Sequence, residues 1–303
     1  MFVVQYRKIW FILSAILIAL SAYAVFAYGF DLSIDFKGGT ITEVRYDGER
    51  PDKELLEIDL KTLGIGGFSL RPSESDRYII RTKELSEDER QGLQALLSRN
   101  QSTFTIERQN TIGPTAGAEL KSKAIKAIAV VVVMIVLFIT FAFRRVSKPV
   151  SSWKYGLATI VALAHDVIIP TGVFVLLGHF MGVEIDLLFI TGLLAILGYS
   201  VHDTIVVFDR VRENLRVNAE QNLSEDFEII VGKSVAQTFG RSINTSLTIF
   251  ITLLALYLVG SPATKDFAFL LIIGIIIGTY SSIFVASPLL VTFYKLQKNR
   301  GSA

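Results

Sequence analysis

Six long apolar runs dominate the pattern of hydrophobic and polar positions along the chain. They lie at about residues 9–29, 124–143, 155–177, 185–208, 242–260 and 266–294. Each run reaches the ~20 residues that a helix needs to cross about 30 Å of hydrocarbon. The runs lack the alternation of membrane-barrel strands, and backbone in lipid must satisfy its polar groups within a helix or a closed barrel. The pattern therefore predicts a polytopic α-helical membrane protein with six transmembrane helices.

The segment at residues 30–122 breaks this pattern, because it holds 17 of the 28 acidic residues of the chain. Alternating positions predict strands at 40–46, 68–71, 77–81 and 103–109, and helical spacing predicts helices at 53–63 and 86–97. The second helix opens with a capping box of Ser86 and Glu89. The order βαββαβ indicates a ferredoxin-like domain with two helices on one face of an antiparallel sheet, a fold that names no function. We therefore divide the chain into an N-terminal part with the first helix (1–29), this α+β domain (30–122) and a five-helix membrane bundle (123–303).

Basic residues collect on one side of the six-helix topology. The loops on the other side, at 178–186 and 260–266, contribute only Lys265. The positive-inside rule then places both termini in the cytoplasm and the α+β domain on the extracytoplasmic side. The residues that carry this asymmetry are Arg7, Lys8, Arg144, Arg145, Lys148, Lys154, Arg210, Arg212, Arg216, Lys295, Lys298 and Arg300.

The first apolar run also has features of a signal peptide. Arg7 and Lys8 precede it, and Ala22-Tyr23-Ala24 resembles a cleavage site. The run continues to Phe30, beyond the length of a usual signal core, so we expect the first helix to be retained.

Composition excludes several kinds of chemistry. The chain is 51% hydrophobic and has no cysteine, so disulfides and thiolate metal sites are ruled out. Gly232-Lys233-Ser234 resembles the end of a phosphate-binding loop, but Phe227 stands where its first glycine is required. His165 and His202 each precede an aspartate without a second helical ligand at the usual spacing. We expect no ATPase, no enzyme activity, no metal, no cofactor and no nucleic-acid partner.

Charged residues inside the apolar runs are the main candidates for function. Asp166 lies near the middle of the third run and Asp203 toward the cytoplasmic half of the fourth. An ionisable residue at this depth costs at least ~2.5 kcal/mol and normally marks an ion or proton path. Arg241 begins the fifth run and is a candidate counter-ion of Asp203. Movement of Arg241 toward or away from Asp203 would change its proton affinity, and fixed pairs that only set helix register are the structural alternative.

Polar and small residues share faces with these charges. On the fourth helix Asp203 shares a face with Tyr199 and Ser200, and on the fifth a polar stripe follows Arg241. We predict that these faces pack together as a polar seam, closed by a face of small residues on the sixth helix. The stripe consists of Arg241, Asn244, Thr245 and Thr248, continued by Thr252, and the small face of Gly274, Gly278, Ser281 and Ser282.

The motif DFKGGT leads into the α+β domain and contains Asp35, Lys37, Gly38 and Gly39. Two consecutive glycines allow backbone angles that other residues resist, which suits a sharp change of direction. A simple turn is the alternative to a hinge. With the similar stretch at 113–120, the motif makes the domain a candidate moving part on two tethers.

Four motifs together resemble the SecF family of protein-translocase subunits. They are DFKGGT, the pair His165-Asp166, GYSVHDTIVVFDRVREN at 198–214 and SSIFVASP at 281–288. DFKGGT is shared with the sister family SecD, whereas the length and the single small outer domain favour SecF. The resemblance covers essentially the whole chain. It implies that Asp203 and Arg241 belong to the family's proton path; Asp166 carries over less directly, and His202 receives no role.

The resemblance also implies a function and partners. The expected protein is an accessory subunit of the Sec translocase in the bacterial cytoplasmic (inner) membrane. With SecD as a heterodimer, it would use the proton motive force to promote preprotein export after the SecA step. The implied partners are SecD, the SecYEG channel, a YajC-type subunit, SecA, the unfolded preprotein and the lipid bilayer. Two alternatives stay open: a self-sufficient proton-coupled exporter of small molecules from the same resistance-nodulation-division superfamily, and a structural scaffold for SecD.

Overall fold

The computed structural model describes residues 2–73, 75–98, 103–144 and 149–301. The chain forms two compact units. The membrane unit comprises Met1–Phe30, Ala127–Val183 and Leu188–Ala303, and the α+β unit comprises Asp31–Lys126 and Glu184–Leu187. The short segment Glu184–Leu187, which the sequence assigns to the membrane bundle, therefore belongs structurally with the α+β domain.

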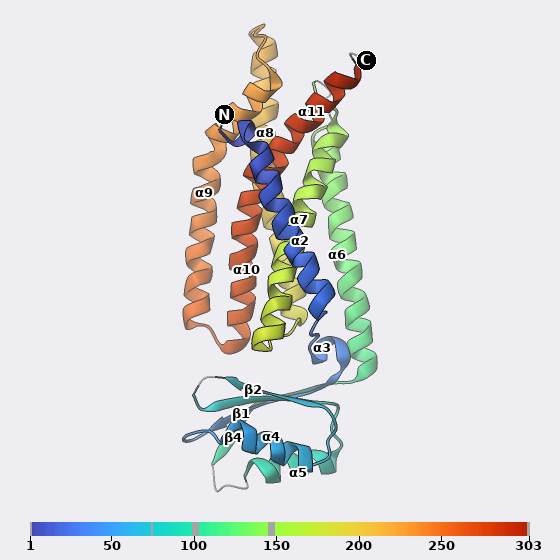
Figure 1. The fold of residues 1–303 in the computed structure, drawn as a ribbon, viewed down its shortest axis with the longest axis vertical. Coiled ribbons are helices and arrows are strands. Elements are labelled where there is room, and N and C mark those ends of the chain that lie inside the picture. Colours follow the sequence, from blue (N-terminus) through green and yellow to red (C-terminus); the bar gives the residue numbers. More distant parts are fainter. Residues whose placement is uncertain (1, 74, 99–102, 145–148, 302–303) are drawn as a thin grey trace. The chain divides into compact units, whose positions relative to one another are not determined.

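Six helices in the described part of the chain are long and apolar enough to cross a membrane, as predicted (Figure 1). After the short α1 (Phe2–Gln5) they are α2 (Arg7–Tyr28), α6 (Pro114–Ala142), α7 (Ser152–Met181), α8 (Leu187–Glu220) and α9 (Phe227–Val259). The sixth consists of α10 (Pro262–Ser281), a π-helical turn η1 (Ser282–Ala286) and α11 (Ser287–Gly301).

Helices α8 and α9 run well beyond the apolar stretches that predict them. The predicted runs end at residue 208 and begin at 242, whereas α8 continues to Glu220 and α9 starts at Phe227. These extensions are amphipathic: Val211, Phe227 and Val231 are buried in the same core as the membrane helices. The extensions lie beyond the apolar runs because a helix that leaves the bilayer needs apolar residues only on its packed face.

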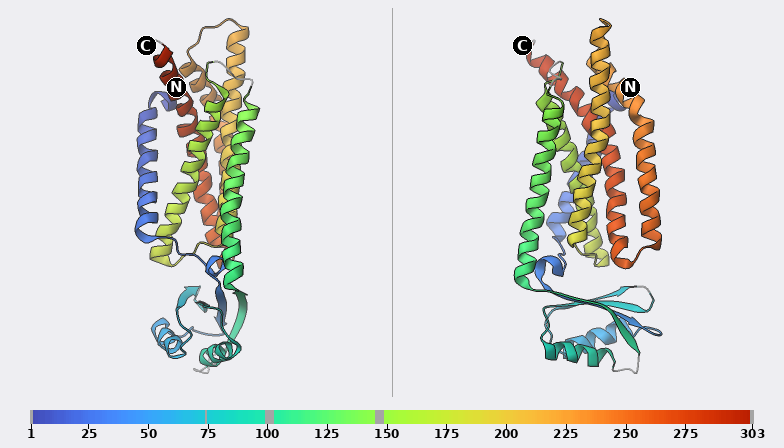
Figure 2. Two further views of the ribbon diagram at one scale, coloured as in Figure 1. Left: turned by 90° about the vertical axis from the view of Figure 1, so that its right-hand side faces the viewer. Right: turned by 180° about the vertical axis from the view of Figure 1, so that it is seen from behind.

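The bundle is closely packed around α7 and α10. Half of the most apolar part of α7 is buried, whereas α2, α6 and α9 expose most of theirs. A Cβ added to Gly172 of α7 would lie 2.3 Å from Ser21 Cβ of α2, so glycine is required for this helix contact. Figures 1 and 2 show α9 beside α10, joined at one end by a short turn.

The α+β unit has the predicted βαββαβ order. Its strands are β1 (Gly39–Tyr46), β2 (Phe68–Ser73), β3 (Arg77–Thr82) and β4 (Phe104–Ile112), and its helices are α4 (Lys53–Thr62) and α5 (Glu87–Leu97), with the short α3 (Ile34–Lys37) before β1. The sheet is antiparallel with the order β2-β3-β1-β4, and α4 and α5 lie on one face of it (Figure 1).

Side chains that alternate between buried and less buried positions along the strands form the core of this unit. On β1 the side chains of Val44 and Tyr46 are buried against the helices, and β3 contributes Tyr78 and Ile80 to the same core. The predicted capping box on α5 is present, since Ser86 and Glu89 bond reciprocally to each other's backbone N–H groups. The ferredoxin-like prediction is therefore confirmed.

Candidate functional site in the membrane bundle

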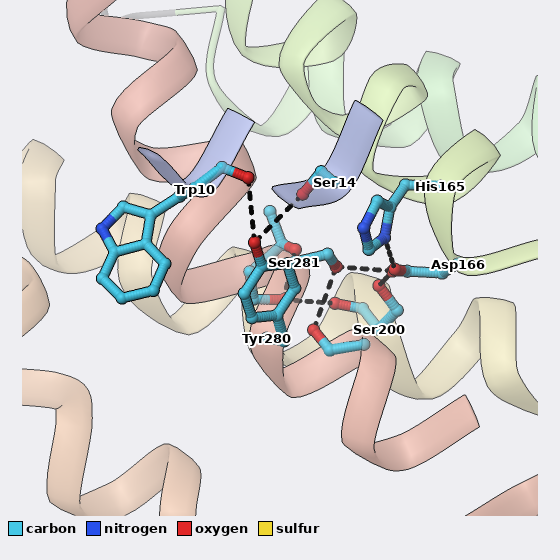
Figure 3. Close-up of polar contacts among 10 residues, drawn as sticks. Trp10, Ser14, His165, Asp166, Ser200, Tyr280 and Ser281 are labelled. Atoms are coloured by element: carbon cyan, nitrogen blue, oxygen red, sulfur yellow. Dashed lines mark hydrogen bonds and ion pairs between the residues drawn. The ribbon is translucent and has the colours of Figure 1, made fainter. Parts of the chain in front are cut away.

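Asp166 on α7 is completely buried and is bonded by three other side chains (Figure 3). Its Oδ1 lies 2.9 Å from Nδ1 of His165. Its Oδ2 accepts hydrogen bonds from the hydroxyls of Ser200 on α8 and Ser281 on α10, the latter at 2.7 Å. Three helices thus meet at one carboxyl group, which the sequence places only near the middle of a span.

Asp203 on α8 forms a second buried carboxyl site. Only 5% of this residue is exposed. Its Oδ1 accepts a hydrogen bond of 2.6 Å from the hydroxyl of Ser242 on α9, and its Oδ2 has no hydrogen-bond partner among the residues that the structure describes. One oxygen is therefore held by the protein and the other is available to a proton or a water molecule.

Hydroxyl groups join the helices around these two sites. Tyr199 on α8 bonds Ser246 on α9 at 2.6 Å, and Ser246 in turn bonds Thr279 on α10 at 2.6 Å. Thr204 on α8 bonds Ser282 of η1 at 2.8 Å. A polar network therefore runs through the packed faces of α7, α8, α9 and α10, and it includes the carboxyl groups of Asp166 and Asp203.

The polar stripe of α9 does not pack into this network, which corrects the predicted seam. Within the described chain Arg241 makes no ion pair, and its neighbours Asn244, Thr245 and Thr248 are exposed like it. Ser242 and Ser246 occupy the inward face instead. Helical spacing shows which residues share a face, but it does not show how the helix is rotated in the bundle. Successive residues are about 100° apart around the helix axis, so a shift of one residue is enough to exchange one face for another.

The small-residue face of the sixth helix lies at close helix contacts. A Cβ on Gly274 would lie 2.2 Å from the side chain of Ile196, and one on Gly278 would lie 3.2 Å from Ser200. Ser281 and Ser282 are fully buried and bond to α7 and α8 respectively. These residues allow α10 and η1 to approach the carboxyl sites.

The two glycines of DFKGGT lie where backbone segments of the α+β unit pass close to one another. Gly38 and Gly39 have positive φ angles of 77° and 136°. A Cβ on Gly38 would lie 2.8 Å from Pro114, and one on Gly39 would lie 2.4 Å from the carbonyl oxygen of Thr82. Lys37 forms an exposed ion pair of 3.2 Å with Asp31. The motif thus has a packing role in this structure, and a hinge role stays a prediction.

Asp35 of the same motif joins a second arrangement, which we call the loop clasp: Asp31, Ser33, Asp35 and Arg81 bound to the segment Glu184–Leu187. Asp35 Oδ2 accepts from the backbone N–H of Leu187, the first residue of α8, at 2.9 Å. Ser33 N–H donates to the Ile185 carbonyl at 2.9 Å, and Ile185 N–H donates to the Asp31 carbonyl at 2.8 Å.

A largely buried ion pair completes the clasp. Arg81 Nε on β3 lies 2.8 Å from Glu184 Oε2, and only 13% and 10% of these side chains are exposed. Burial raises the pKa of Glu184 to about 7, although Arg81 acts in the opposite direction. Burial also lowers the pKa of Arg81. The clasp therefore contains a carboxyl group that titrates near neutral pH.

Among the described residues, no group of three or more His, Cys, Asp or Glu side chains could hold a metal ion. Lys233 pairs with Glu225 at 2.5 Å on the surface of α9, so the Gly232-Lys233-Ser234 stretch is part of a helix and not a phosphate-binding loop.

Comparison with known proteins agrees with this architecture. The family model "Protein export membrane protein SecD/SecF, C-terminal" matches residues 93–296, and "SecD/SecF GG Motif" matches residues 23–49. A protein translocase subunit SecF from Thermobaculum terrenum is 38% identical, covering 96% of this chain and 93% of its own length. One from Anaerolinea thermophila is 35% identical over 94% and 91% of the two chains.

A solved structure shows the same fold. The crystal structure of SecDF, a translocon-associated membrane protein from Thermus thermophilus, superposes with a TM-score of 0.84 at 34% identity. The match covers 98% of this chain and 38% of that one. Helical bundle, α+β domain and motifs define a multi-pass membrane protein of the protein-export class. The chain belongs to the SecD/SecF family of protein-export membrane proteins, and the SecF subunits above match it along nearly their whole length.

Several residues of these sites were not predicted from the sequence. Ser242 and Ser246 lie next to the predicted stripe residues in the sequence. They were missed because the sequence does not show which face of α9 points into the bundle. Glu184 is 103 residues from Arg81 in the chain, and no local pattern connects them. A single histidine does not by itself indicate a functional site. His165, however, is an ionisable residue beside Asp166 in the middle of an apolar run, and on this ground the sequence could have indicated it as a site residue.

Proposed function

We propose that this chain is an accessory subunit of the Sec protein translocase that acts with SecD and uses the proton motive force to promote preprotein export after the SecA step. The observation that carries the proposal is the pair of buried carboxyl sites in the bundle. Among the described residues neither Asp166 nor Asp203 contacts a lysine or arginine. A buried carboxyl group without a fixed counter-charge favours binding of a proton.

The size of the driving force is sufficient for a conformational change. One proton that moves through a potential of 100 mV supplies roughly 2.3 kcal/mol, which shifts a two-state equilibrium about fifty-fold. Asp203 is the group that we assign to this step, because its Oδ2 is unbonded among the described residues. Asp166 is a second site on the same path.

SecD is the proposed partner in the membrane. The exposed stripe of Arg241, Asn244, Thr245 and Thr248 places a charge and three polar side chains on the outside of α9. Such a face is unfavourable in lipid but suits the surface of another helical bundle. The Thermus thermophilus SecDF chain is long enough to contain a second unit, since this chain covers 38% of it. We propose that Arg241 reaches the proton path from this interface.

Both termini lie in the cytoplasm. The short segments rich in lysine and arginine are on the same side of the membrane as the termini, and such segments stay in the cytoplasm. The α+β domain then lies outside the inner membrane, where it holds the emerging unfolded preprotein as it leaves the SecYEG channel; SecA and a YajC-type subunit are the further partners. No ATP hydrolysis by this chain is involved.

The experiment is preprotein export into inverted membrane vesicles that contain SecD and this chain as their only copies. We expect Asp203→Asn to abolish the part of export that depends on the proton motive force, while SecD still co-purifies. Asp209→Asn, the same exchange at an exposed position of α8, is the matched control. Export by Asp203→Asn at the wild-type rate, with the complex intact, would refute the proposal.

A further inference from the structure

His165 has surroundings that a structural histidine does not require. The residue is 1% exposed and lies beside Asp166 on α7. Its Nδ1 is 2.9 Å from Asp166 Oδ1, and its Nε2 is buried without a hydrogen-bond partner in the described part of the chain. A buried nitrogen without a hydrogen-bond partner destabilises the fold, so its presence here indicates that this nitrogen has a function.

The hydrogen bonds of Asp166 limit where a further proton can bind to this pair. Oδ2 lies within hydrogen-bond distance of the hydroxyls of Ser200 and Ser281, and the Ser281 hydroxyl also reaches the carbonyl oxygen of Gly278. The bond between Oδ1 and Nδ1 holds one proton, whichever of the two atoms it is nearer. Among the polar side-chain atoms of the pair, His165 Nε2 is the one without a hydrogen-bond partner in the described residues, so it is the open position for a further proton.

The surroundings of the imidazole ring accept a positive charge. The ring of Tyr280 on α10 stacks on it with centroids 5.7 Å apart and an angle of 22° (Figure 3). An aromatic face at this distance stabilises a cation. The Tyr280 hydroxyl bonds Ser14 Oγ at 3.1 Å and the Trp10 carbonyl at 3.0 Å, which fixes the ring. Ser200 and Ser281, the other side chains that bond to the pair, are neutral.

We propose that His165 is a proton-carrying residue of the bundle and that it works as one unit with Asp166. In the empty state the pair has a charge of −1, with Nδ1–H bonded to the carboxylate and Nε2 bare. In the loaded state Nε2 carries the transported proton and the pair is neutral. Asp166 keeps its hydrogen-bond partners in both states, and the proton enters and leaves at Nε2. The inference rests on the proposed function and assigns this pair as the second proton site beside Asp203.

A positioning role is the competing explanation, and one substitution separates the two. In His165→Asn the side-chain amide can still donate to Asp166 from the position of Nδ1, but it cannot ionise. In His165→Leu the donor is lost as well. If His165 only orients Asp166, the asparagine variant retains proton uptake; if it carries the proton, both variants lose it.

The test is proton uptake by the full chain reconstituted with SecD, under an applied potential. We expect His165→Asn and His165→Leu to reduce uptake at least tenfold while SecD still co-purifies. His179→Asn, the same exchange at an exposed position of α7, should leave uptake unchanged. Uptake by His165→Asn within twofold of wild type would overturn the inference, whether or not His165→Leu loses it.

A second measurement does not depend on the variants. The chain has three histidines, so the imidazole nitrogens of the wild-type complex can be resolved by ¹⁵N labelling. We expect Nε2 of His165 to be bare without an applied proton gradient and to carry a proton while uptake proceeds. The same state of Nε2 with and without the gradient would overturn the inference, even if wild-type uptake is normal. Absence of uptake by the wild-type complex, with Nε2 still changing its state, would instead refute the proposed function.

Discussion

The loop clasp makes the attachment of the segment Glu184–Leu187 to the α+β domain dependent on pH. In the clasped form burial raises the pKa of Glu184 from its ordinary 4.5 to about 7. The clasp therefore favours protonated Glu184. This contribution is fully present below about pH 4.5 and is lost as the pH rises through 7. The difference corresponds to roughly 3 kcal/mol, or about two orders of magnitude in the clasping equilibrium.

Glu184→Gln is the perturbation that isolates this effect. The amide has the shape of the protonated carboxyl group and does not titrate. The variant should therefore stay clasped at pH 8. In the wild type at that pH, Glu184 and Arg81 are both ionised, and burial of the two charges away from water destabilises the clasp. Because only about a tenth of either side chain is exposed, screening by solvent reduces the effect little.

Hydrogen exchange reports the clasp directly, since the N–H groups of Ile185 and Leu187 both donate to it. After correction for intrinsic exchange, we expect protection of these amides in the wild type to fall about a hundredfold from pH 5 to pH 8. In Glu184→Gln the protection should be independent of pH. Glu119→Gln, which removes an exposed carboxylate paired with Lys123, is the control.

Either of two results would refute this reasoning. Wild-type protection that stays constant across the range would show that Glu184 does not titrate in the clasp. A pH dependence that persists in Glu184→Gln would assign it to another group.

Two further predictions concern packing and capping. Gly172→Ala should destabilise the bundle by about 1–3 kcal/mol, because its Cβ would lie 2.3 Å from that of Ser21 and the helices would have to separate. Thermal unfolding in detergent measures this, and Gly198→Ala, whose Cβ meets nothing within 4 Å, is the control; equal melting temperatures for the two variants would contradict the contact. Asp35→Ala should remove about 1 kcal/mol from the clasp and lower the protection of the Leu187 amide about fivefold at constant pH. Unchanged protection would mean that another group satisfies this amide.

Elements with strong local patterns were predictable from the sequence. Six apolar runs of membrane length and the alternation within residues 30–122 predict the helices and the βαββαβ order, and Ser86 and Glu89 predict the start of α5. The apolar patterns and the structure have the same cause, since lipid or a packed core selects apolar residues at the positions that leave water.

The composition of the site was predictable only in part. The sequence places Asp166 and Asp203 inside the bundle, but contacts between helices depend on rotations that a single helix does not encode. This is why Ser242, and not Arg241, bonds Asp203 in the structure. The clasp joins Glu184 to Arg81, which are 103 residues apart in the chain, and such a long-range pairing leaves no local pattern in the sequence.

Proton uptake by the complex of this chain with SecD from the same source is the most direct test of the central claim. With both subunits in one vesicle and a potential applied, we predict uptake by the wild type and its loss in Asp203→Asn. Arg241→Met should impair it as well, and SecD should co-purify with each variant. Uptake by Asp203→Asn at the wild-type rate would contradict the account, because the buried carboxyl group of α8 would then have only a structural role.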